Sequence, residues 1–164
     1  MPPKPKPPRA PRKSRRRKPS ERRLLEKQLW DLTSLYVRLR DEQCVTCGAT
    51  EGLTMSHWIK AGKQRVRYDL RNVNCQCKTC NGRHNHWTVY YDNYMLYHYS
   101  QETLIQLTEW GREKAWKWSV LSLRDMVCDR YYALSGLLKD KPNRDFENKK
   151  ADIAARNDTW RRNA

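Results

Sequence analysis

The chain has 164 residues, of which 34 are lysine or arginine and 18 are aspartate or glutamate, so its formal net charge is +16. It has no apolar run near 18 residues and no signal-peptide pattern, which argues against a membrane protein and against an oxidising compartment. A surplus of positive charge this large indicates a polyanionic partner, and we expect nucleic acid.

The basic surplus is concentrated at the N-terminus. Residues 4–18 hold nine lysines and arginines and no acidic residue, and seven of the eight prolines lie at or before Pro19. Such a segment buries too little apolar surface to offset its ordering entropy, so residues 1–19 are predicted to form a disordered arm that contacts phosphates. The alternatives are a solubility tail and a membrane-surface patch, the latter without a supporting amphipathic helix or lipidation signal. The DNA-binding candidates of the arm are Arg9, Arg12, Lys13, Arg15, Arg16, Arg17 and Lys18.

A helix is predicted over residues 20–42, with Ser20 as its N-cap. Its apolar residues recur at a four-three-four-three spacing, which forms one narrow helical stripe that must be buried. These residues are Leu25, Leu29, Leu32, Tyr36 and Leu39. Packing within the monomer and a dimer seam both satisfy the pattern, and two and a half heptads are too few to establish a coiled coil.

Two Cys-x-x-Cys pairs follow, Cys44/Cys47 and Cys77/Cys80. Two residues between cysteines let a tight turn direct both thiolates at one ion, and two pairs complete the tetrahedral sulfur shell of a structural zinc site. Redox dithiols are the alternative, but the βαβ pattern that accompanies them is absent. We predict a structural Zn²⁺ site. Cys75 and Cys128 are expected to pack as small apolar residues.

The segment between the cysteine pairs is longer than in an ordinary zinc ribbon, so it has room for a hairpin that carries chemistry. Strands are predicted over residues 53–59 and 72–76. Phosphodiester hydrolysis needs a base for water, a cation on the phosphate and cationic donors around the developing charge. His57 is the candidate base, because histidine exchanges protons near neutral pH.

Asn81 follows a zinc ligand directly, at a predicted helix start, and its amide oxygen suits Mg²⁺. His84 and His86 are further candidate ligands for this metal. The loop between the strands offers four candidate phosphate contacts, for which a solvated basic loop is the alternative. They are Lys60, Lys63, Arg65 and Arg67. Asn72 is expected to tie this loop to the backbone through its side-chain amide.

Beyond the cysteines lies an aromatic-rich stretch, residues 87–99, whose rings could stack on unpaired bases. Ser100 is then the predicted N-cap of a helix that runs over residues 101–109. A third apolar stripe follows at helical spacing and is expected to be core: Val120, Leu123, Val127, Tyr131, Leu134 and Leu138. Residues 100–140 are therefore assigned to C-terminal helices, and residues 141–164 to a polar tail or loose helix.

The ordered motifs resemble a known group of proteins. They are Cys44-Val-Thr-Cys47, Ser56-His57, Arg71-Asn72-Val73 and Cys77-Lys-Thr-Cys80-Asn81. From Gln43 to Leu138 the chain resembles the phage NinG (Rap) recombination-protein family and, more widely, the HNH or His-Me finger endonucleases, with phage recombination endonuclease VII more distant. The resemblance implies an α+β, mostly helical fold whose zinc-stapled ββα-metal core occupies residues 43–99.

The resemblance also implies a structure-selective DNA endonuclease that cuts Holliday junctions or D-loops with Mg²⁺ or Mn²⁺. By position, His57 is the base, Asn81 the metal ligand and Asn72 the loop organiser. Ser56 occupies a metal-binding position that is often acidic in His-Me nucleases. A non-catalytic zinc-ribbon DNA-binding factor is the alternative, while RNA binding has no module signature. We expect the cytoplasm of an infected bacterium as the location, and a possible homodimer, since symmetric junction cleavage needs two active sites.

Overall fold

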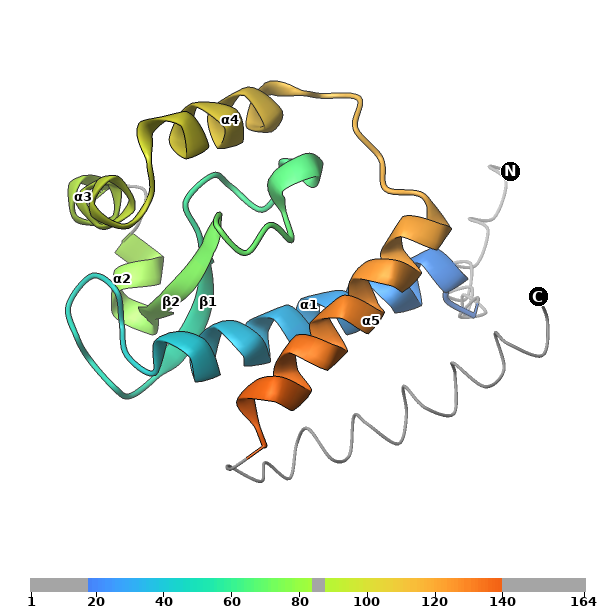
Figure 1. The fold of residues 1–164 in the computed structure, drawn as a ribbon, viewed down its shortest axis with the longest axis horizontal. Helices are drawn as coiled ribbons and strands as arrows, with labels where there is room; N and C mark the ends of the chain where they lie inside the picture. Colours follow the sequence, from blue (N-terminus) through green and yellow to red (C-terminus); the bar gives the residue numbers. More distant parts are fainter. Residues whose placement is uncertain (1–17, 84–87, 140–164) are drawn as a thin grey trace, which may run out of the picture.

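The computed structural model describes residues 18–83 and 88–139, so most of the predicted arm, His84, His86 and the predicted tail lie outside the described residues. Five helices and one two-stranded sheet make up the described part (Figure 1). The elements are α1 (Glu21–Asp41), β1 (Leu53–His57), the short 3-10 helix η1 (Gln64–Val66), β2 (Val73–Cys77), α2 (Lys78–Arg83), α3 (Thr88–His98), α4 (Gln101–Arg112) and α5 (Val120–Leu137). None of the helices in the described ranges is both long and apolar enough to cross a membrane. The prediction of a mostly helical fold with a small sheet is therefore confirmed.

Helix α1 begins where the sequence predicts, because the Ser20 side chain accepts a hydrogen bond from the Arg23 backbone N–H. Its apolar stripe packs along α5, and the two helices lie side by side across the molecule (Figure 1). The buried residues of this helix pair are Leu25, Leu29, Leu32, Leu35, Leu123, Val127, Leu134 and Leu138. Packing within the monomer thus accounts for the predicted stripe, while the homodimer stays a prediction.

Strands β1 and β2 pair antiparallel, with Leu53 opposite Cys77 and His57 opposite Val73. The predicted strands were slightly displaced, since β1 ends two residues earlier and β2 is shifted by one residue. The side chain of Asn72 explains the early end of β1. Its Oδ1 accepts from the Ile59 N–H and its Nδ2 donates to the Ile59 carbonyl, so a side chain replaces the strand ladder there.

The two faces of the hairpin differ in chemistry. On one face, Met55, Val73 and Cys75 pack against Val37 of α1 in a small apolar core. Side chains alternate along a strand, so the other face carries Thr54, Ser56, Asn74 and Gln76, of which the last three are buried. The hairpin therefore has an apolar side toward α1 and a buried polar side toward α2 and α3.

Helix α3 covers part of the aromatic stretch for which the sequence predicted no defined element. Its Tyr91 and Met95 are fully buried and pack with Leu104 and Leu107 of α4. Helix α4 begins after Ser100 as predicted, and it extends three residues beyond the predicted end. Gly111 lets α4 pack closely on Ile59, because a Cβ at position 111 would lie only 2.9 Å from the Ile59 side chain.

Candidate metal centre and adjoining polar site

The four cysteines of the two pairs converge on one point. Their sulfur atoms all lie within 4.8 Å of one another, and those of Cys47 and Cys77 are 3.8 Å apart. A tetrahedral zinc ion with bonds of about 2.3 Å would separate its sulfur ligands by about 3.8 Å. The geometry fits a structural metal ion such as zinc, held by Cys44, Cys47, Cys77 and Cys80.

The first cysteine pair lies in a tight knuckle. The Gly48 N–H donates to the Cys44 carbonyl at 2.8 Å, and Gly48 has a φ of +75°, a left-handed conformation that favours glycine. Burial alone would raise the pKa of Cys44, but backbone N–H donors of Cys77, Cys47 and Thr46 lower it to about 7. These donors therefore favour the thiolate of Cys44, which is the form that binds a metal.

The other two cysteines have different environments. Cys75 is fully buried in the apolar face of the hairpin, as predicted, and burial raises its pKa to about 11. Cys128 is half-buried on α5. Neither belongs to the sulfur cluster of the described residues.

Two of the predicted metal-site residues meet beside this cluster. The Ser56 hydroxyl of β1 donates to the Asn81 Oδ1 of α2 at 3.1 Å. The Asn81 Nδ2 in turn donates to the Thr54 hydroxyl at 3.1 Å and to the Met55 carbonyl at 3.4 Å. Asn81 follows Cys80 directly, so the cysteine cluster fixes the helix that carries it. The result is a pair of adjacent neutral oxygen atoms at the edge of the hairpin.

His57 lies next to this pair along β1 but contacts other elements. Its Nε2 is 2.9 Å from the carbonyl of Arg67, and its ring stacks on Trp30 of α1 with the centroids 5.4 Å apart. A carbonyl can only accept a hydrogen bond, so Nε2 carries the proton and the lone pair of the neutral ring is on Nδ1. Ser56 thus contacts α2, while the His57 ring contacts α1 and the loop after η1.

Asn72 makes the contacts that the sequence analysis expected of it. It is fully buried, and its Nδ2 donates to the carbonyls of Ile59 and Val66 at 2.9 and 3.0 Å. These bonds connect Asn72, at the end of the loop between β1 and β2, to the start and the middle of that loop. Because the same loop supplies the Arg67 carbonyl, Asn72 also holds the acceptor that orients His57.

The four basic residues of the loop divide into two kinds. Lys60 and Lys63 are exposed and can reach a phosphate. The Arg65 guanidinium lies over the rings of Trp110 and Trp116 and pairs with Glu113. The guanidinium of Arg67 lies over Trp30 and Tyr68. Both arginines are half-buried against aromatic rings, whereas the two lysines are exposed, and phosphate binding by all four residues stays a prediction.

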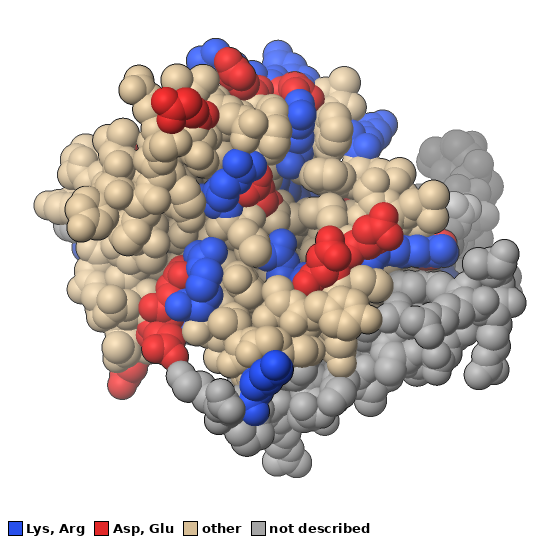
Figure 2. All heavy atoms as spheres, in the orientation of Figure 1, with Lys and Arg blue, Asp and Glu red and all other residues tan. Residues whose placement is uncertain are grey.

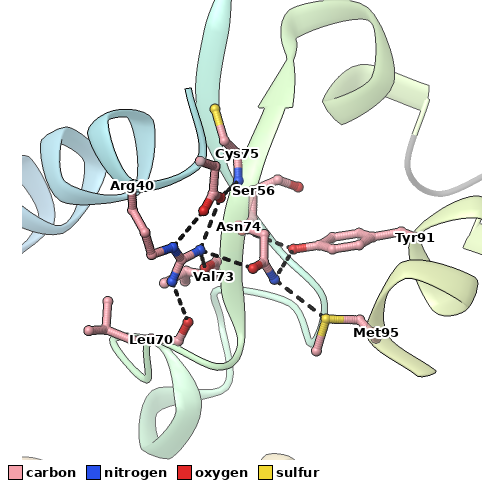
Figure 3. A network of polar contacts seen from close by, with 9 residues as sticks. Arg40, Ser56, Leu70, Val73, Asn74, Cys75, Tyr91 and Met95 are labelled. Atoms are coloured by element: carbon pink, nitrogen blue, oxygen red, sulfur yellow. Dashed lines mark hydrogen bonds and ion pairs between the residues drawn. The ribbon is translucent and has the colours of Figure 1, made fainter. Parts of the chain in front are cut away.

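A polar network that the sequence analysis did not identify supports this hairpin (Figure 3). Arg40, at the end of α1, donates to the carbonyls of Leu70 and Val73 and to the Asn74 Oδ1, at 2.9 to 3.0 Å. Burial would lower the pKa of Arg40, but its hydrogen bond and charge interaction with Asp41 raise it. Asp41 also accepts from the Cys75 N–H at 2.7 Å.

Asn74 extends the network to α3. Its Nδ2 donates to the Tyr91 hydroxyl at 3.1 Å and contacts the Met95 sulfur at 3.4 Å, and Figure 3 shows both side chains reaching it from the same helix. The Tyr91 hydroxyl donates to the Ser56 carbonyl at 3.4 Å. The backbone of Ser56 is therefore connected, through Asn74, to the end of α1. The only sequence signal for Asn74 was its place between two apolar strand residues, Val73 and Cys75.

The surface charge of the described residues is mixed. On the face shown in Figure 2, lysine and arginine side chains are interspersed with acidic ones. Much of the positive surplus read from the sequence belongs to residues 4–17, which lie outside the described part. Salt-dependent phosphate binding by the arm thus stays a prediction.

The chain was also compared with known protein families, curated proteins and solved structures. The family described as "Bacteriophage Lambda NinG protein" matches residues 4–141, which is most of the chain. Neither the search of curated proteins nor the search of solved structures gave a significant match.

Proposed function

This chain belongs to the NinG family of bacteriophage lambda, and from that premise we propose that it is a metal-dependent endonuclease acting in an infected bacterium. Its substrates would be branched recombination intermediates, Holliday junctions or D-loops, which it cuts by phosphodiester hydrolysis. The observation that carries the proposal is the Ser56–Asn81 oxygen pair beside the cysteine cluster. His57 directly follows Ser56 on the same strand, with its ring on the opposite face of the hairpin.

His57 is the proposed general base. Its Nε2–H donates to the Arg67 carbonyl, which leaves Nδ1 as the nitrogen that accepts a proton from the attacking water. The Trp30 ring restricts the imidazole from one side, and Asn72 holds the loop that presents the carbonyl. These contacts orient the base before the substrate arrives, which is the condition for efficient proton transfer.

The hydroxyl of Ser56 and the amide oxygen of Asn81 are the proposed ligands for Mg²⁺ or Mn²⁺. Both are oxygen donors, which these ions prefer, and they lie 3.1 Å apart. The bound ion would stabilise the charge that develops on the scissile phosphate and the leaving oxygen. The four cysteines would hold a structural zinc ion that fixes β2 and α2 relative to each other. Lys60 and Lys63, with Lys18 and the arm before it, would bind neighbouring phosphates.

A non-catalytic DNA-binding factor is the second candidate. In the structure the Asn81 side chain is hydrogen-bonded to the hydroxyls of Ser56 and Thr54 and to the Met55 carbonyl, none of which is a carboxylate. Mg²⁺ usually relies on one or two carboxylates, and neutral oxygens alone bind it weakly. In that case the same cysteine-linked hairpin would serve as a platform for DNA recognition.

A junction-cleavage assay separates the two candidates. Zinc-loaded protein with Mg²⁺ or Mn²⁺ should nick a four-way junction in preference to linear duplex. His57→Ala should lower the cleavage rate by about 100-fold or more and leave junction affinity nearly unchanged. The matched control is His98→Ala, which changes an exposed histidine on α3 and should cut normally.

Asn81→Ala tests the metal position in the same assay. It should raise the Mg²⁺ concentration needed for cleavage, whereas Asn93→Ala, at an exposed position of α3, should not. Tight junction binding without cutting under any divalent metal would favour the binding factor. Symmetric cutting of both strands would further support a homodimer, because one chain supplies one active site.

A further inference from the structure

We infer that a second site of this protein, a tryptophan-lined cavity next to the His57 loop, binds an unpaired base of DNA. The inference rests on the proposed function only in taking DNA as the ligand. The cavity has a volume of about 300 Å³ and lies between the loop that carries η1 and the segment that joins α4 to α5. Its lining includes Arg65, Tyr68, Asp69, Trp110, Trp116 and Trp118.

The walls of the cavity are suited to a flat aromatic ring. The rings of Trp116 and Trp118 meet edge to face, with centroids 5.4 Å apart and an angle of 81° between their planes. The Arg65 guanidinium already lies over the rings of Trp110 and Trp116, at 4.4 and 4.7 Å from the centroids. Guanidinium and nucleobase planes use the same indole faces, so a base can stack where this cation now packs.

The cavity also offers polar groups for the edge of a base. The Nε1 of Trp116 is buried and has no hydrogen-bond partner among the described residues, whereas the Nε1 of Trp118 donates to the Gln64 carbonyl at 2.8 Å. A buried donor without a partner is uncommon and is destabilising unless a ligand satisfies it. The Asp69 carboxylate, held in place by Arg71, supplies an acceptor. Every nucleobase carries an acceptor that could meet the indole N–H.

The surroundings favour a nucleic-acid strand as the source of the base. Lys114 and Lys117 are exposed on the segment that carries Trp116, where they can bind the phosphates on either side of the base. Bases inside a duplex have both faces covered by their neighbours, so only an unpaired base can enter. Branch points supply such bases. Because Arg67 lies between Arg65 and Tyr68 in the chain, the loop that orients His57 also lines this cavity.

Fluorescence of 2-aminopurine, a base analogue, tests the inference without cleavage. Two short duplexes are compared with no added Mg²⁺ or Mn²⁺, one with the analogue unpaired and one with it paired. The full zinc-loaded chain should quench the unpaired probe and bind that duplex more tightly. Trp116→Ala should weaken binding of the unpaired duplex by about 5- to 100-fold and change binding of the paired one little. Trp116→Phe should retain most of the preference.

Tyr132→Ala is the matched control, since it removes an exposed ring from α5 and should leave the preference unchanged. Equal affinity of the wild-type protein for both duplexes, with no quenching, would overturn the inference even if Trp116→Ala does not fold. If the protein cuts junctions but shows no quenching, the inferred base-binding site is refuted and the proposed nuclease activity is supported. Quenching without cutting would support the site and count against the nuclease.

Discussion

The α1–α5 helix pair and the β1–β2 hairpin are stabilised in different ways. The helix pair buries leucines and valines on both sides of its contact, and the Glu21–Arg124 ion pair lies at its surface. The hairpin buries five polar side chains, Ser56, His57, Asn72, Asn74 and Gln76, and adjoins a cluster of four cysteines. Apolar packing tolerates substitutions that conserve volume, whereas a buried polar network is destabilised when one partner is missing.

This difference indicates which region of the molecule is more sensitive to substitution and to metal removal. The candidate site lies on the polar hairpin, so its geometry depends on directional contacts and on a four-cysteine cluster that could hold a metal ion. The helix pair, by contrast, mainly contributes burial. Loss of the metal ligands or of a buried charged partner should therefore have a larger effect on the hairpin than loss of one leucine has on the helices.

Removal of a metal ion from the cysteine cluster should produce the largest difference in stability between the hairpin and the helix pair. Metal chelation, or Cys77→Ser, should release one zinc ion per chain and disorder the hairpin, because structural zinc contributes roughly 10 kcal/mol to the folding of comparable small sites. Hydrogen exchange should show lost protection in β1 and β2 before α5. Cys128→Ser, outside the cluster, should keep its zinc. Unchanged protection of the strands in zinc-free protein would refute this prediction.

Arg40→Leu should have the next largest effect. It leaves the Asp41 carboxylate, whose side chain is only 9% exposed, without its cation and removes donors from three hairpin acceptors. Breaking such a buried pair destabilises a protein by about 3 to 5 kcal/mol. Urea unfolding measures the loss, and Arg38→Leu, at an exposed position of the same helix, is the control. Equal effects of the two substitutions would contradict the role of the network.

Leu29→Ala tests the helix pair. Leu29 is fully buried between α1 and α5, and its truncation should lower the free energy of unfolding by about 3 kcal/mol. Leu24, on the same helix, is 37% exposed, so Leu24→Ala should lower the free energy of unfolding by about 0.5 kcal/mol. The hairpin amides should keep their relative protection in Leu29→Ala. Selective loss of hairpin protection would show that the two regions are not stabilised separately.

Tyr91→Phe should produce the smallest effect at neutral pH, about 1 to 2 kcal/mol, because it removes one hydroxyl from the hairpin network. Burial raises the pKa of Tyr91 well above its usual value. The folded state therefore keeps the phenol proton above about pH 10, where the unfolded chain loses it, and stability falls as pH rises through that range.

The alkaline fall in stability should be weaker in Tyr91→Phe than in the wild-type protein. Urea unfolding at neutral and alkaline pH measures it, with Tyr132→Phe, on the surface of α5, as the control. Parallel stability curves for the wild type and Tyr91→Phe would rule out this contribution.

Local sequence signals predicted much of the fold and part of the site. Ser20 and Ser100 cap helices where expected, and the cysteine spacing correctly predicted a four-sulfur cluster. These features depend on residues that are close in sequence or on a spacing rule with few solutions. The stripe of α1 likewise predicted burial, although only the structure identifies α5 as its partner.

Features that depend on distant contacts were not predictable. Helix α3 exposes Val89, Tyr90, Leu96 and Tyr97 while it buries Tyr91 and Met95, so its apolar residues follow no single face. The packing of Arg65 on Trp110 and Trp116, which are far away in the chain, had no sequence signal, while its predicted phosphate contact stays a prediction. Arg40 likewise looked like an ordinary helix-end cation until the fold placed Asn74 beside it.

Helix α1 contacts both regions, because it packs on α5 with its leucine stripe and on the hairpin through Val37 and Trp30. During synthesis, residues 53–77 leave the ribosome well before residues 120–138, and at 5 to 20 residues per second the interval lasts several seconds. Helix α1 can therefore pack on the hairpin first, before α5 has been synthesised and can cover the leucine stripe. In that interval the leucine stripe is an apolar surface that α5 does not yet cover.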